Sequence, residues 1–71
     1  MIKMDLLDYE IYAKGEHIAD FDDIDKAKQY AEFIAHEYIV DTRVICKWTG
    51  EIITEFVVKT TTHIKIVEVK P

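Results

Sequence analysis

The segment "FDDIDKAKQYAEFIAHEY", residues 21–38, decides the fold because it carries the periodicity of a helix between two groups of strand-like segments. Asp22 or Asp23 can accept hydrogen bonds from the first free backbone N–H groups of this helix, and Asp25 suits the positive end of its dipole. The apolar stripe recurs at steps of three and four, through Ile24, Ala27, Ala31, Ile34, Ala35 and Tyr38. We therefore expect a helix over residues 23–38, whose alanines let it lie close to a sheet.

Two strand-like segments precede the helix. Residues 6–13, LLDYEIYA, alternate between two faces with the period of two that is typical of a half-buried strand. Residues 14–16 predict a tight turn, because Gly15 tolerates the positive φ that hairpin turns need. We expect residues 17–21, HIADF, to return antiparallel to the first strand.

The register of this hairpin has two alternatives. A two-residue loop would place Ile11 opposite Ile18. A three-residue loop with a bulge would place Ile11 opposite Ala19, and Tyr9 opposite Phe21. The second register keeps more apolar residues on one face, and a one-residue slip would turn that face over. We therefore prefer the second.

Three more strand-like segments follow the helix, with a second glycine turn at residues 49–51 between the first two. These segments are residues 42–48, 52–59 and 63–70. The element order is therefore β-β-α-β-β-β. This order predicts a single α+β domain over residues 1–71, in which the helix packs on one face of a mostly antiparallel sheet.

A single helix leaves the other face of the predicted sheet without a cover. The aliphatic residues expected on that face are Ile45, Ile53, Val57, Val67 and Val69. Five β-branched residues exceed what a solvent face needs, although such residues also favour strands intrinsically. A chain of 71 residues buries only about 60% of its unfolded surface, and chains of this size often complete their core by oligomerising. We therefore expect a homodimer.

Phe33 is a second candidate for a contact surface. It lies about 140° from the centre of the helix's apolar stripe, beside His36, so a regular helix exposes it. One interpretation is that residues 39–41 or the last strand cover Phe33, or that it is an ordinary exposed apolar residue. The other is that it belongs to an interface, where aromatic residues are enriched. The candidate interface residues are Phe33, His36, Ile45, Ile53 and Val57.

Charge is distributed unevenly along the chain, whose formal net charge is −5. Residues 1–41 hold eleven acids and four bases, and residues 42–71 hold three acids and five bases. The acidic half is either a solvated surface or a surface for a partner protein with a basic face. Phosphate binding requires clustered cations, which argues against nucleic acid as the partner. Weak nucleic-acid binding is the alternative function, and its candidate contacts are Arg43, Lys47, Lys59 and Lys65.

We expect no catalytic site, metal or cofactor. Cys46 alternates with Val44 and Trp48, which predicts a core thiol instead of a nucleophile. The three histidines are 19 and 27 residues apart, without the local spacing of a zinc site. The acids of residues 20–25 lack the glycine and glutamate positions of a calcium loop, and helix capping explains them. The sequence thus predicts a protein that is not an enzyme.

The single cysteine and the lack of long apolar runs predict a cytoplasmic protein without a membrane segment. The stretch "YEIYAKGEHIADFDDIDKAKQYAEFI", residues 9–34, resembles the opening of many small uncharacterised proteins encoded by bacteriophages and prophages. The resemblance covers about half of the chain. It implies a small accessory protein that acts by binding another protein, with no catalytic residues. The predicted function is a self-associating protein–protein interaction module, with a phage-type accessory or inhibitor role.

Overall fold

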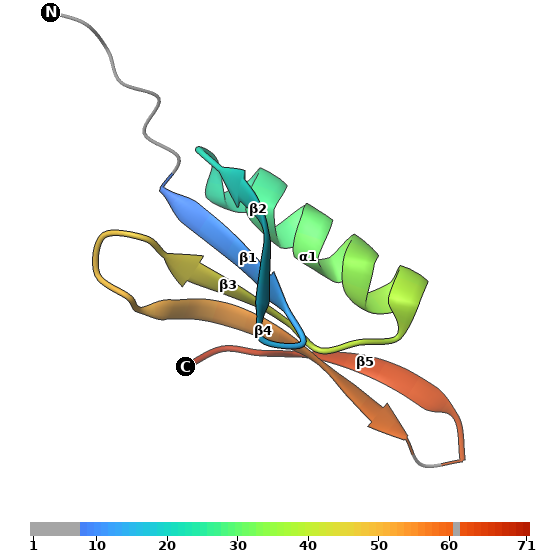
Figure 1. Cartoon of the computed structure of the whole chain (residues 1–71). Helices are drawn as coiled ribbons and strands as arrows, with labels where there is room; N and C mark the ends of the chain where they lie inside the picture. The colour runs from blue at the N-terminus through green and yellow to red at the C-terminus, as the bar shows by residue number, and fades with distance from the viewer. Residues whose placement is uncertain (1–7, 61) are drawn as a thin grey trace, which may run out of the picture.

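The structure is a computed structural model that describes residues 8–60 and 62–71 (Figure 1). Within these ranges it contains one helix and one antiparallel sheet with the strand order β2-β1-β3-β4-β5. The elements are β1 (Tyr9–Ala13), β2 (Glu16–Phe21), α1 (Ile24–Tyr38), β3 (Thr42–Cys46), β4 (Ile52–Thr60) and β5 (Ile64–Val69). The predicted α+β class and element order are confirmed. The expected start of the first strand, residues 6 and 7, lies outside the described residues.

Helix α1 begins where its sequence predicts. Asp23 is the N-cap, and its Oδ1 accepts hydrogen bonds from the N–H groups of Asp25 at 2.8 Å and Lys26 at 3.2 Å. The C-cap is Ile39, whose φ of 53° is left-handed and whose N–H donates to the carbonyl of Ala35. A β-branched residue rarely adopts this conformation, so the cap is strained. No helix in the described ranges is both long and apolar enough to cross a membrane.

The β1–β2 hairpin combines parts of both expected arrangements. Its turn has two residues, Lys14 and Gly15, with φ values of 54° and 79°. A register shift further along β2 then places Ile11 opposite Ala19, so that Ile18 is the extra, bulged residue. The preferred register is therefore confirmed, but a bulge inside the strand produces it and the loop itself stays short.

The β3–β4 turn begins earlier than the sequence predicts. Strand β3 ends at Cys46, whose carbonyl accepts a hydrogen bond from the N–H of Gly50 at 2.8 Å. Trp48 therefore lies in the turn, where its side chain is 62% exposed, and the expected place on the core face is wrong. Its indole N–H donates to the Asp8 carboxylate at 2.7 Å. Period-two alternation stops at the strand end, so it cannot place a residue beyond that end.

A second bulge lies in β4. Ile45 pairs with Ile52 while Val44 pairs with Thr54, which leaves Ile53 as the extra residue. Ile53 packs against the core on the helix side of the sheet, whereas directly opposed residues such as Ile45 and Ile52 share a face. The sequence predicts Ile52 on the core face and Ile53 on the other face, and the structure has them the other way round. The bulge reverses the alternation for the part of β4 that precedes it.

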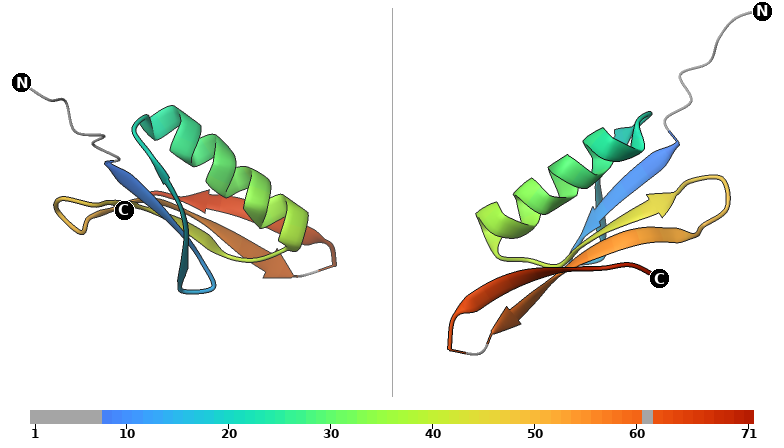
Figure 2. Two further views of the ribbon diagram at one scale, coloured as in Figure 1. Left: turned by 45° about the horizontal axis from the view of Figure 1, so that its top comes forward. Right: turned by 180° about the vertical axis from the view of Figure 1, so that it is seen from behind.

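Helix α1 lies across one side of the sheet, which we call the covered face (Figure 2). The core on this face is formed by Ile11, Ala27, Ala31, Ala35, Val44 and Phe56. The three alanines allow the close approach that the sequence predicts. Thr42 links β3 to α1, since its buried hydroxyl donates a hydrogen bond to the carbonyl of Ala31 at 2.9 Å.

Candidate interaction surface on the open sheet face

The second side of the sheet has no covering element among the described residues, and we call it the open face. Its aliphatic residues share this face through cross-strand pairs. Val57 lies opposite Val67, and Ile45 lies opposite Ile52. Val69 lies opposite Glu55 and is 42% exposed, while the other four are half-buried. We call these five residues, Ile45, Ile52, Val57, Val67 and Val69, the aliphatic patch.

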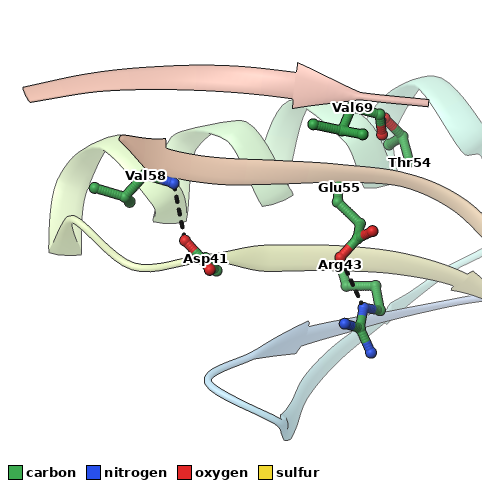
Figure 3. Close-up of polar contacts among 6 residues, drawn as sticks. All are labelled: Asp41, Arg43, Thr54, Glu55, Val58 and Val69. Carbon is green, nitrogen blue, oxygen red and sulfur yellow. Dashed lines mark hydrogen bonds and ion pairs between the residues drawn. The ribbon is translucent and has the colours of Figure 1, made fainter. Parts of the chain in front are cut away.

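An ion pair crosses the middle of the open face. Arg43 Nε lies 3.2 Å from Glu55 Oε2 (Figure 3), and the two residues are opposed in register. Their side chains are 48% and 31% exposed, so solvent screens the pair and it adds little to stability. The pair does satisfy both charges within the face. The aliphatic patch is therefore not interrupted by an unpaired charge at this position.

Polar contacts hold the three strands that carry the patch. Asp41 immediately precedes β3, and its carboxylate accepts a hydrogen bond from the N–H of Val58 at 2.8 Å (Figure 3). On the covered face, the buried hydroxyl of Thr54 lies 2.8 Å from Glu68 Oε2 and 3.3 Å from the carbonyl of Val69. These contacts fix β5 against β4. Hydrogen bonds therefore hold the strands that carry the patch in place.

The four candidate nucleic-acid contacts do not gather in one place. Arg43 is paired with Glu55, as described above. Lys47 lies in the β3–β4 turn with its Nζ 5.6 Å from the ring centroid of Trp48. Lys59 and Lys65 oppose each other near the far end of the β4–β5 hairpin. Phosphate binding gains from clustered cations, and this arrangement spreads them out.

The five candidate interface residues fall into three places. Ile45 and Val57 lie on the open face. Phe33, which is 56% exposed, and His36 lie on the solvent side of α1, across the sheet from the open face. Ile53 packs against the core. The sequence did not point to Ile52 as a surface residue, because only the bulge reveals its side.

A groove of about 600 Å³ lies between the second half of α1 and the β1–β2 hairpin. It is lined by Ala13, Lys14, Glu16, Ile18, Tyr30, Ile34, Tyr38 and Val40. Ile18 lines this groove because the bulge turns its side chain to the covered face. The sequence did not predict this bulge inside β2, so it did not predict the groove. Its exposed apolar residues include Tyr38, at 66%, and Ile18, at 38%.

Cys46 is less deeply buried than the sequence predicts. It is half-buried at the end of β3. Hydrogen bonds from the side chain and backbone of Thr49 and from the backbone of Trp48 lower the pKa of the thiol, against the opposing effects of burial and of Asp8. The β3–β4 turn therefore supplies the perturbation, and no histidine contributes to it.

No model of a protein family, no curated protein and no solved structure matches the chain. Function is therefore inferred from the residues themselves. None of the five patch residues belongs to the hydrophobic core, and Val69 is one of the large apolar residues that are exposed.

Proposed function

We propose that the protein is a non-enzymatic interaction module that self-associates through the aliphatic patch of the open face. One observation supports this proposal more than any other. Helix α1 packs on one face of the sheet, and no described element packs on the other face. Removing apolar surface from water contributes about 25 cal/mol per Å². Five neighbouring aliphatic residues on a fixed sheet are a favourable surface for such burial.

A second copy of the chain is the occupant that fits this surface best. In a two-fold dimer a patch meets the same patch, so an apolar surface is matched automatically. Two sheets pack face to face about 10 Å apart, with their side chains interdigitated. Each sheet would then lie between its own helix and the sheet of its partner. The small size of the chain also favours completing the core in this way.

Phe33 and His36 lie outside the interface that we propose. Phe33 is a single exposed apolar residue, and the residues around it on α1 are charged or polar and exposed, including Lys26, Gln29 and Glu37. Scattered single apolar residues are normal on protein surfaces and need no partner. The patch differs because it contains two direct cross-strand pairs of aliphatic residues, Ile45 with Ile52 and Val57 with Val67.

An accessory role is part of the proposal, as the resemblance to small phage proteins implies. The single cysteine favours the cytoplasm, and the acidic first half favours an inhibitor as the kind of accessory protein. In that role the dimer would act by binding another protein. The uneven charge of the chain favours a partner with a basic surface. Nucleic-acid binding is not favoured, because the four candidate cations do not form one cluster. Arg43 forms an ion pair with Glu55, and Lys47 lies in a different turn from Lys59 and Lys65.

The test is the solution mass by light scattering over a concentration series, for the natural chain, Val57→Lys and Phe33→Glu. We expect a dimer for the natural chain and for Phe33→Glu, and a monomer for Val57→Lys. Circular dichroism establishes that each variant is folded. A natural chain that stays monomeric at high micromolar concentration overturns the proposal. A dimer broken by Phe33→Glu and kept by Val57→Lys overturns the choice of face.

A further inference from the structure

Three side chains with metal-binding atoms meet on the open face of the β1–β2 hairpin. Glu10 lies directly opposite Asp20 in register. His17 Nε2 lies 2.8 Å from Asp20 Oδ1. One potential ligand atom from each of the three residues lies within 4.8 Å of the other two. The register of the sheet, and not a flexible loop, therefore brings the three groups together.

The bulge in β2 is what places His17 on this face. Residues three apart in a regular strand point to opposite sides, so His17 and Asp20 would be separated by the sheet. The extra residue, Ile18, shifts the alternation by one and puts both side chains on the open face. Bulges are frequent beside functional sites because they redirect a side chain in this way.

The electrostatics of the cluster favour a cation. Like charges directly opposed on neighbouring strands destabilise a sheet, and Glu10 and Asp20 are such a pair. Within the described residues, neither carboxylate forms an ion pair with a lysine or arginine, and His17 is the only basic side chain bound to either.

The donor set selects the kind of ion. One imidazole nitrogen and two carboxylate oxygens suit Zn²⁺ and similar transition metals, whereas Ca²⁺ and Mg²⁺ prefer oxygen ligands alone. Bonds of about 2.0–2.1 Å place the ligand atoms of a tetrahedral zinc ion about 3.3 Å apart. The three candidate atoms already lie within 4.8 Å of one another. The side chains of His17 and Asp20 are 44% and 30% exposed, so water can fill a fourth position.

We propose that Glu10, His17 and Asp20 bind a divalent transition-metal ion, with water as the fourth ligand. Tyr12 supports the site, because its hydroxyl donates to Glu10 Oε1 at 3.4 Å and orients that carboxylate. The expectation that the chain has no metal site rested on the spacing of the three histidines and on the assignment of the acids of residues 20–25 to helix capping, which is wrong for Asp20 because it lies in β2. That spacing is uninformative here, since this site uses one histidine and draws its other ligands from two strands.

The proposal is tested by titrating Zn²⁺ into the metal-free chain by isothermal calorimetry. We expect one ion bound per chain, and affinity at least about tenfold weaker in His17→Ala and in Asp20→Asn, since each removes one of three ligands. His36→Ala is the matched control, because His36 is exposed on α1 and should leave the affinity unchanged. Co²⁺ binding to the natural chain should give the visible absorption of a tetrahedral site.

Thermal unfolding gives a second readout that does not depend on the heat of binding. Zn²⁺ should raise the Tm of the natural chain more than that of His17→Ala, because an ion stabilises the native state in proportion to how tightly that state binds it. The proposal is overturned by a chain that binds no Zn²⁺ at 100-micromolar concentrations, or by His17→Ala binding as tightly as the natural chain. Repeating the titration on Val57→Lys separates metal binding from self-association.

Discussion

The two faces of the sheet differ in what covers them and in how deeply their aliphatic residues are buried. On the covered face, Ile11 and Val44 are fully buried beneath α1, and Phe56 is 3% exposed. On the open face, Ile45 and Val57 are only half-buried, although each is the direct chain neighbour of a core residue. Strand alternation thus builds two apolar surfaces from one set of strands. The helix covers one surface, and we propose that a second copy of the chain covers the other.

The largest expected difference between the two faces is between Phe56 on the covered face and Val57 on the open face. Phe56→Ala should lower the free energy of unfolding by about 3–5 kcal/mol, because it opens a cavity in the core. This is a large part of the total stability of such a chain, which is roughly 4–10 kcal/mol. Val57→Ala should cost much less in the dilute, monomeric chain. Urea denaturation measures both values, and equal costs would show that the two faces are not different in kind.

The contact between Thr42 and α1 gives the next largest expected effect. Thr42→Val keeps the shape of the side chain but removes the hydroxyl that donates to the carbonyl of Ala31. We expect a loss of about 0.5–1.5 kcal/mol, the net value of one such hydrogen bond. Thr62→Val is the control, since Thr62 is exposed and should change stability little. If the two substitutions have the same effect, Thr42 does not fasten the helix to the sheet.

The strained end of α1 gives the smallest expected effect, and it has the opposite sign. Ile39→Gly should raise the free energy of unfolding by about 0.5–1 kcal/mol, because glycine adopts the left-handed φ of this cap without steric cost. Val40→Gly is the control. That residue has no positive φ, so the same change there should destabilise the chain. Chemical denaturation of both variants measures the difference, and destabilisation by Ile39→Gly would contradict the strained cap.

The sequence predicts the elements of this fold better than it predicts their irregularities. Capping by Asp23, the alanine stripe and the pairing of Ile11 with Ala19 follow from periodicity and turn chemistry. The bulges at Ile18 and Ile53 do not, because an extra residue leaves the composition of a strand unchanged while it reverses the faces on one side.

Both functional proposals depend on these bulges. The bulge in β4 brings Ile52 to the aliphatic patch, and the bulge in β2 brings His17 to the two carboxylates. The sequence contains the residues of each surface, but it does not show that they lie on the same face of the sheet. Had the bulged register been extended to the polar positions, the opposition of Glu10 and Asp20 would have been predictable. The approach of His17 would still have required the structure.

An isotope-filtered NOE experiment on an equal mixture of labelled and unlabelled chains tests the central claim most directly. That claim is that the open face joins two copies while the covered face serves the fold. We predict intermolecular NOEs at the methyl groups of Val57, Val67 and Val69, and none at Val44. Intermolecular NOEs confined to the ring of Phe33, or none at any position at high micromolar concentration, would contradict it.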